Sequence, residues 1–242
     1  MRDADGIPPL YRGYKFFRRR EAYASIQIRF ESKTGLTVGL SGWGRLLTYK
    51  ADIAGGALKV YESRIVADLL LRRLPAAEWR QAIEIENVLQ KNSTATAKRQ
   101  ATLIKSRLKK MTPELLLLVR DGTKPIATQA VFASAIAHSA LLRDFLIQDI
   151  RDRFRAGNLA LTRNHWRAYV ASCLERDPEM STWAASTTDK LGDSVFQILT
   201  EVGLLSHGSQ PLLQPVHYQA EVTAYLKAHG FDDVLRAMHA FL

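Results

Sequence analysis

From about Val60 onward, apolar residues recur every three to four positions along the chain, and Pro, Gly or Asn interrupts the pattern at intervals. This spacing places apolar side chains on one face of an α-helix. The sequence therefore predicts an all-α protein, folded as a multi-helix bundle. Up to residue 202, the predicted helices lie near 60–73, 76–90, 93–110, 113–121, 125–137, 139–156, 162–175 and 186–202.

Residues at the predicted helix ends agree with this interpretation. Glycine adopts the left-handed backbone that is common at helix C-termini, and Gly122, Gly157 and Gly203 are predicted to end helices. Thr112 is followed by Pro113, which suits the first position of a helix. Side chains that can accept a hydrogen bond from the free N–H groups of a first turn precede four helices, at Ser93, Thr112, Thr162 and Ser186.

The pattern changes after Gly203. Residues 210–217 (QPLLQPVH) are extended in character, and two amphipathic stretches follow near 218–229 and 231–241. A helix, a short strand and a helix would form a small winged-helix-like C-terminal unit, in which Pro211 and Pro215 would confine the strand to a sheet edge. A plain loop that crosses the bundle fits the same residues, and the sequence does not separate the two interpretations.

The first 48 residues differ from the rest of the chain. Residues 24–30 and 36–40 alternate apolar and polar positions, which is compatible with a β-hairpin. A basic disordered tail and a start codon placed too early are two other interpretations of this segment. The predicted organisation is an N-terminal extension at 1–48, a first helical unit at 49–120 and a second helical unit at 121–242.

Composition bounds the class of protein. With 242 residues, 47% of them hydrophobic, the chain can bury a substantial core. Its single cysteine, Cys173, excludes an internal disulfide. Residues 14–20 are bulky and charged where a signal peptide would need an apolar stretch, and the longest uncharged run, 125–142, is too polar for a membrane span. We expect a soluble, cytoplasmic protein that makes no membrane contact.

The charge of the chain points to an anionic partner. Lys and Arg number 34 against 24 Asp and Glu, which gives a formal net charge of +10. The excess lies in two segments, since residues 1–50 have ten basic and four acidic side chains and residues 91–110 have seven basic and none acidic. The second of these segments coincides with a predicted helix.

Residues 76–110 predict a helix, a short turn at 91–93 and a second helix, which is the layout of a helix-turn-helix unit. The second helix has a predicted buried face, made by Ala97, Ala101, Ile104 and Leu108. Its other face is predicted to present cations and hydroxyl groups to solvent. The candidate nucleic-acid-binding residues come from this outer face and from the helix start, and they are Lys91, Ser93, Thr94, Thr96, Lys98, Arg99, Lys105, Arg107, Lys109 and Lys110.

Double-stranded DNA is the predicted ligand of this face. Lys and Arg displace counterions from phosphates, and Ser and Thr hydroxyls fix the register of a protein on nucleic acid. Small polar side chains at 93–96 would let a recognition helix approach base edges. An unliganded surface helix usually mixes charge signs to gain pairs four residues apart. The alternative interpretation is a solvated basic face that binds nothing.

The rest of the sequence offers no sign of catalysis. It contains no phosphate-binding loop, no zinc-protease motif and no serine-hydrolase motif, and its six histidines show no metal-ligand spacing. No catalytic residue, cofactor, metal or small-molecule substrate is therefore expected. A second basic group is interleaved with acids and is interpreted as a self-paired, solvated face, made by Arg143, Asp144, Asp149, Arg151, Asp152, Arg153 and Arg155.

Several stretches, in order, resemble the BrxA family of small accessory proteins in BREX bacteriophage-exclusion systems. The resemblance covers about 49–227 and leaves out the first 48 residues. It implies a mostly helical fold with a core similar to that of the NusB antitermination factor, DNA binding, and a place beside other BREX subunits in a defence complex. The matching stretches include GGALKVYESRIVADLLL (55–71), NVLQKNSTATAKRQATLIKSRL (87–108), ATQAVFASAIAHSALLRDFL (127–146) and WAASTTDKLGDSVFQILTEVGLL (183–205).

The predicted function is that of a non-enzymatic, DNA-binding accessory protein of such a system. Two alternatives stay open. The basic helix could dock on an acidic partner subunit in a protein–protein scaffold, or the protein could bind RNA in the manner that a NusB-like fold implies.

Overall fold

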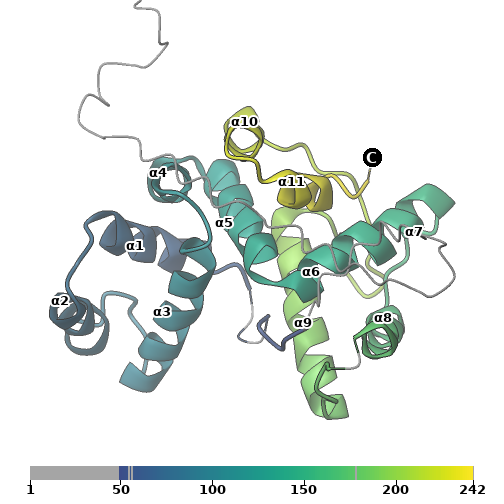
Figure 1. Cartoon of the computed structure of the whole chain (residues 1–242), viewed down its shortest axis with the longest axis horizontal. Coiled ribbons are helices and arrows are strands. Elements are labelled where there is room, and N and C mark those ends of the chain that lie inside the picture. Colours follow the sequence, from purple (N-terminus) through teal and green to yellow (C-terminus); the bar gives the residue numbers. More distant parts are fainter. Residues whose placement is uncertain (1–48, 54, 56, 178, 242) are drawn as a thin grey trace, which may run out of the picture. The chain divides into compact units, whose positions relative to one another are not determined.

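The computed structural model describes residues 49–241, with the exception of residues 54, 56 and 178 (Figure 1). The described residues belong to one compact unit, and every regular element among them is helical. The all-α prediction is thus confirmed. The hairpin predicted from 24–30 and 36–40 lies outside the described residues.

The helices follow one another closely along the chain. Two of them, η2 and η3, are π-helical turns that continue the flanking α-helices. In order, the elements are α1 (Val60–Leu71), α2 (Ala76–Arg80), η2 (Gln81–Ile85), α3 (Thr94–Leu108), α4 (Pro113–Asp121), α5 (Lys124–His138), α6 (Ala140–Phe145), η3 (Leu146–Ile150), α7 (Arg151–Ala156), α8 (Arg163–Arg176), α9 (Ala185–Val202), α10 (Ala220–Ala228) and α11 (Asp232–Met238).

Two of the predicted N-caps form as expected. The Ser93 hydroxyl accepts a hydrogen bond from the Thr96 N–H at 3.2 Å, and Thr162 forms a reciprocal capping box with His165. The three predicted helix ends are also confirmed, because α4, α7 and α9 end at Gly122, Gly157 and Gly203.

The other two predicted caps differ from expectation. Thr112 stands at the N-cap position of α4, but its hydroxyl contacts the side chains of Glu114 (2.5 Å) and Tyr225 (3.0 Å) instead of capping the helix. The cap predicted at Ser186 is wrong, because α9 begins at Ala185 and Ser186 therefore lies inside its first turn.

The helix predicted for 76–90 ends early, at Ile85. Asn87 and Gln90 both have left-handed backbones, with φ of 49° and 52°. The Asn87 side chain accepts a hydrogen bond from the Lys91 N–H at 2.9 Å and donates one to the Lys91 carbonyl at 2.8 Å. Because a continuous right-handed helix cannot contain such residues, the connection to α3 is the segment 86–93 and not the short turn at 91–93.

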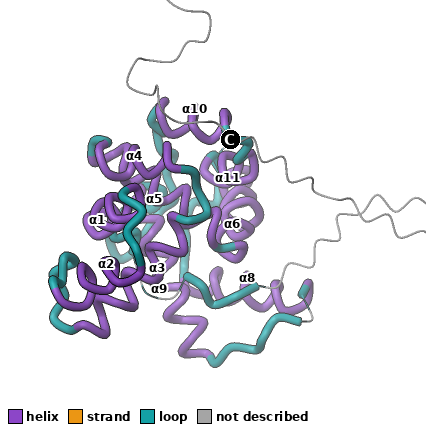
Figure 2. The backbone as a smooth tube through the Cα atoms, turned by 60° about the vertical axis from the view of Figure 1, so that its left-hand side comes forward, coloured by secondary structure: helices purple, strands orange, loops and turns teal. Residues whose placement is uncertain are grey.

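One hydrophobic core joins the described helices, and α5 runs through its middle (Figure 1 and Figure 2). α5 packs against α1, α3, α4, α9, α10 and α11, and its Phe132 and Ile136 side chains are fully buried. The core extends from Tyr49 to Ala240 and crosses the boundary predicted at residue 120. The two predicted helical units are therefore parts of one compact unit.

The chain bends by 103° between α5 and the helical stretch 140–156. Ser139 forms this bend: its hydroxyl accepts a hydrogen bond from the Leu142 N–H at 3.3 Å and donates one to Asp52 at 2.5 Å. Among the described residues, no single helix is long and apolar enough to cross a membrane, and these two helices pass the same test only when taken together as a bent pair.

The segment between α9 and α10 is an extended loop. It makes two isolated antiparallel bridges, Ala160 with Leu212 and Leu205 with Leu213. Within the described part of the chain these bridges do not continue into a strand, and α10 and α11 pack on α5. The plain-loop interpretation describes this region better than the winged-helix-like one.

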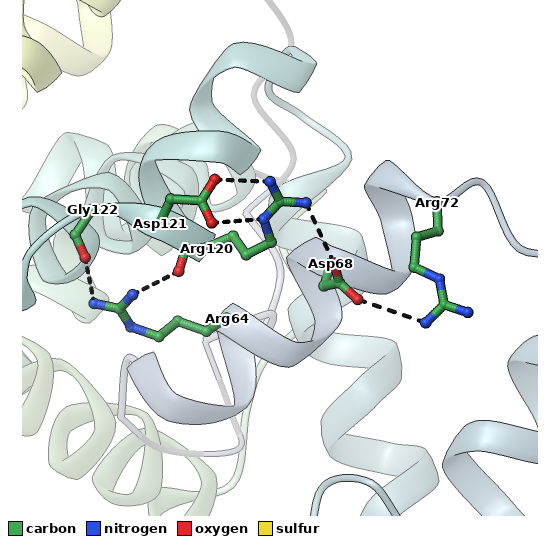
Figure 3. A network of polar contacts seen from close by, with 6 residues as sticks. All are labelled: Arg64, Asp68, Arg72, Arg120, Asp121 and Gly122. Carbon is green, nitrogen blue, oxygen red and sulfur yellow. Dashed lines mark hydrogen bonds and ion pairs between the residues drawn. The ribbon is translucent and has the colours of Figure 1, made fainter.

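Arginine side chains join α1 to α4 (Figure 3). The Arg64 guanidinium donates to the carbonyl oxygens of Arg120 and Gly122, both at 2.7 Å, and so satisfies acceptors at the C-terminal end of α4. Arg120 in turn pairs with Asp121 at 2.8 Å and with Asp68 at 3.3 Å. This network fixes the two helices against each other.

Candidate nucleic-acid interface

Helix α3 has a buried face and a solvent face, as the sequence predicts. It packs against α1, α5 and η2. The apolar side chains on this inner face are at most 1% exposed, and they are Ala97, Ala101, Ile104 and Leu108. The inner face therefore anchors α3 in the core and leaves the opposite side to solvent.

The solvent face of α3 is basic. The helix contains no Asp or Glu, so none of its cations can pair with an acid on the same helix. Four of the predicted cations are exposed on α3 or directly after it, namely Lys98, Arg99, Lys109 and Lys110. We call these four residues and Lys105 the basic face.

Lys98 is exposed but already has an anionic partner. Its Nζ lies 3.2 Å from the Glu84 Oε1 of η2. The side chain of Lys98 is 65% exposed, whereas that of Glu84 is 24% exposed. Any external anion that approaches this ammonium group must compete with the Glu84 carboxylate.

Lys105 lies against an aromatic ring. Its Nζ is 3.6 Å from the ring centroid of Trp79 on α2, a cation–π contact. Partial burial, together with the nearby charge of Lys109, lowers the pKa of Lys105 below its usual value. Its ammonium group therefore stands at the edge of the basic face, between the indole ring and solvent.

Arg107 does not belong to the basic face. Its side chain is buried, with the residue only 2% exposed, and it donates to the Ala57 carbonyl at 3.3 Å. Burial lowers the pKa of Arg107 to about 10, while the carboxylates of Asp52 and Glu201 favour the charged form. A nucleic acid on the surface of α3 cannot reach this side chain, so the sequence-based assignment of Arg107 is corrected.

Lys91 does not belong to the basic face either. Its Nζ is 2.5 Å from the Glu62 Oε1 of α1, and both side chains are largely buried. Burial alone would raise the pKa of Glu62, but the hydrogen bond and charge of Lys91 lower it overall. Lys91 thus holds the 86–93 segment to α1.

The hydroxyl groups around α3 bond mainly within the helix itself. The Ser93 hydroxyl donates to the Thr96 hydroxyl at 2.9 Å. Thr102 donates to the Lys98 carbonyl and Ser106 to the Leu103 carbonyl, both at 2.8 Å. Thr94, another predicted contact, is exposed in the first turn.

The helix-turn-helix unit stays a prediction. α2 with η2 and α3 are consecutive and in contact, but the 86–93 connection between them is longer than the three to four residues typical of that motif.

The self-paired interpretation of the acids and arginines of 143–155 holds for two ion pairs. Arg143 pairs with Asp144 at 3.1 Å and Arg153 with Asp149 at 2.7 Å. Across the described ranges, no group of three or more His, Cys, Asp or Glu side chains is placed to hold a metal ion.

Comparison with known families decides the classification. The model of the BrxA family matches residues 47–230, a range that holds α1 to α10 and the whole basic face. The chain belongs to the BrxA family. The resemblance found in the sequence is thereby confirmed.

Two curated BrxA relatives match most of the chain. "BREX protein BrxA" of Paramagnetospirillum magneticum (strain AMB-1) is 48% identical over 190 residues, which are 78% of this chain and 96% of that protein. The protein of the same name from Escherichia coli O9:H4 (strain HS) is 30% identical over 184 residues, 76% of this chain and 86% of its own length.

The fold is shared with an experimental structure. A crystal structure of an uncharacterized protein from Magnetospirillum magneticum has a TM-score of 0.75 and 46% identity with this chain, and the match covers 79% of this chain and 98% of the other. The helical arrangement described here is thus similar to one already seen by crystallography.

Residues of α2 and η2 shape the basic face of this BrxA-family chain, and the sequence did not reveal them. Glu84 pairs with Lys98, Trp79 lies under the Lys105 ammonium group, and Ile85, the residue after Glu84, is 70% exposed. Contacts between two helices follow no fixed spacing along the chain, so only the packing of α2 and η2 on α3 brings these residues together.

Proposed function

We propose that the protein is a non-enzymatic accessory component of a BREX bacteriophage-exclusion system and that it contacts duplex DNA through α3. The name "BREX protein BrxA", borne by relatives 48% and 30% identical, supports the assignment to that system. The lack of any catalytic signature in the sequence supports an accessory role.

The charge distribution of α3 carries the DNA-binding part of the proposal. A solvent-facing helix normally gains stability from opposite charges four residues apart, but every ionisable side chain of α3 is basic. An acid-free row of cations on a helix whose other face is buried suits an external polyanion. Duplex DNA carries a phosphate charge about every 1.7 Å along its axis and releases counterions when Lys or Arg binds.

A DNA titration across salt concentrations tests this proposal. The variant K98A/R99A/K105A/K109A removes four cations of the basic face. Each phosphate contact contributes about 0.9 to the slope of log K against log salt. We therefore expect the wild-type protein to bind a labelled duplex with a steep slope and the variant to bind weakly, with a slope shallower by up to about 3.6.

A matched control removes the same charge elsewhere. Exposed cations on α5, α7, α9 and α10 provide the variant K124A/R155A/K190A/K227A, which should keep the wild-type slope. An equal loss of DNA affinity in both variants would show a general effect of net charge. Equal affinity of all three proteins would place the DNA site elsewhere. Failure of the wild-type protein to bind at low salt would overturn DNA binding.

A second candidate function is that of a protein–protein scaffold. The end of η2 combines an apolar and a charged side chain, since Ile85 is 70% exposed and directly follows Glu84, which pairs with Lys98. Such a combination of an apolar side chain and ion pairs is also compatible with a protein interface. This function predicts little DNA binding by the isolated protein and stable co-purification with other BREX subunits, weakened by I85D.

RNA binding is separated from DNA binding by competition. Unlabelled duplex DNA should displace the labelled duplex at lower concentration than duplex RNA of the same length. The opposite order would favour RNA as the ligand.

A further inference from the structure

We propose that the basic face contacts the phosphate backbone of duplex DNA without reading base sequence. We also propose that the ion pair with Glu84 of η2 keeps Lys98 from contributing to this contact. The inference rests on the proposed DNA binding and concerns the manner of recognition at the same site. Three features of the structure lead to it.

The first feature is the use of hydroxyl protons on α3. Thr102 and Ser106 each donate their only hydroxyl proton to a carbonyl of the same helix, at 2.8 Å. The Ser93 hydroxyl proton goes to Thr96 at 2.9 Å. Base acceptors in the major groove need donors, so these side chains would have to give up helix hydrogen bonds in order to read guanine or thymine.

The second feature is the position of Glu84. Its Oε1 lies 3.2 Å from Lys98 Nζ, near the N-terminal end of α3. A recognition helix usually contacts bases with its N-terminal residues, and a carboxylate there repels the phosphates that flank any base. Contact is therefore shifted toward Arg99 and the C-terminal cations Lys105, Lys109 and Lys110.

The third feature is the kind of cation that remains. Lysine acts as a point charge that follows phosphates with little geometric demand. Arg99 is the exposed arginine of the basic face, and its forked donors suit a paired contact with guanine better than the ammonium group of a lysine does. The choice between phosphate and base recognition at Arg99 is open to a direct test, because R99K keeps the charge and loses the forked donor geometry.

The first measurement compares wild type, R99K and R99A on a panel of duplexes that have equal length and different sequences. Phosphate recognition predicts that the affinities of wild type for the duplexes differ by no more than about threefold. R99K should keep nearly the full affinity, and R99A should weaken binding to every duplex by the same factor. Sequence-specific proteins discriminate by about a thousandfold or more. A tenfold or larger preference for one duplex that disappears in R99K would overturn the proposal.

The second measurement is a gain of binding in E84Q. Without the carboxylate, Lys98 becomes available for one further phosphate. The salt slope should then steepen by about 0.9, which corresponds to binding up to about eightfold tighter at 0.1 M salt. Misfolding cannot produce tighter binding, so the readout does not depend on stability.

E175Q is the matched control for E84Q. It removes one exposed carboxylate from α8, and we expect it to leave the slope unchanged. Equal slopes for wild type and E84Q, or an equal increase in E175Q, would refute the role of Glu84. If wild type bound no duplex at low salt, the proposed function would fail together with this inference, whereas sequence-dependent binding would overturn the inference alone.

Discussion

At the scale of single residues, the same type of side chain serves opposite purposes on α3. Arg99 is exposed, whereas Arg107 is 2% exposed and lies near Asp52 and Glu201. The difference follows from helical phase, because Arg107 lies three residues after Ile104 and immediately before Leu108, on the inner side of the helix. Composition marks both residues as basic, and only their angular position and the packing assign their roles.

We predict that R107A lowers the free energy of unfolding by about 1 to 3 kcal/mol, because it leaves the buried Ala57 carbonyl without the guanidinium that donates to it. Urea denaturation followed by circular dichroism measures this change. The folded variant should keep the salt slope of DNA binding, since Arg107 contacts no phosphate.

R99A is the counterpart on the same helix. A surface substitution of this kind changes stability by no more than about 0.5 kcal/mol, yet we expect it to weaken DNA binding. If R107A proved as stable as R99A, the structural role of the buried Arg107 side chain would be wrong.

At the scale of elements, local chemistry sets where α3 begins, and tertiary contacts set what precedes it. The Ser93 cap was readable from the sequence. The end of η2 at Ile85 was not, because it depends on left-handed residues at Asn87 and Gln90 and on the Lys91–Glu62 pair with α1. Turns that are held by a distant helix leave a weak local signal.

We predict that S93A destabilises the protein by about 1 kcal/mol through loss of the hydrogen bond to the Thr96 N–H. Thermal and urea unfolding measure the loss. T94A, one residue further along in the exposed first turn, serves as the control and should change stability much less. Similar effects of the two substitutions would contradict the capping role.

At the scale of the whole molecule, Tyr49 and Leu58, which precede α1, form hydrogen bonds with distant parts of the chain. The Tyr49 hydroxyl donates to Asp144 at 2.9 Å, and its N–H donates to Asp177 at 2.9 Å. The Leu58 N–H donates to Glu201 of α9 at 2.7 Å. These hydrogen bonds join Tyr49 and Leu58, from the first predicted helical unit, to residues of the second unit, in agreement with a core that continues across residue 120.

A partly buried histidine near Asp52, His138, predicts how stability depends on pH. Burial lowers the pKa of His138, with Asp52 opposing and Arg107 and Lys110 reinforcing the shift. The unfolded chain then takes up a proton near pH 6.5, and the folded protein does so only at lower pH. The contribution of His138 to stability is therefore complete above about pH 6.5 and is lost as the pH falls below it.

We expect the free energy of unfolding to fall between pH 7.5 and 5.5, by at most about 1.4 kcal/mol per pH unit for this one proton. In H138Q this part of the pH dependence should be absent. Urea unfolding at a series of pH values compares the two proteins, and identical profiles would exclude His138 as the cause.

The sequence by itself determined the helical class, most helix boundaries, the inner face of α3 and the family. These features depend on periodicity, on caps and on residue order, which are local properties of the chain. Tertiary structure alone decided that Arg107 is buried and that Lys91 is paired with a carboxylate, that Glu84 and Trp79 adjoin the basic face, and that one core spans residues 49–240. The physical reason is that ion pairs and packing between helices join residues at arbitrary separations along the chain, so no local pattern records them.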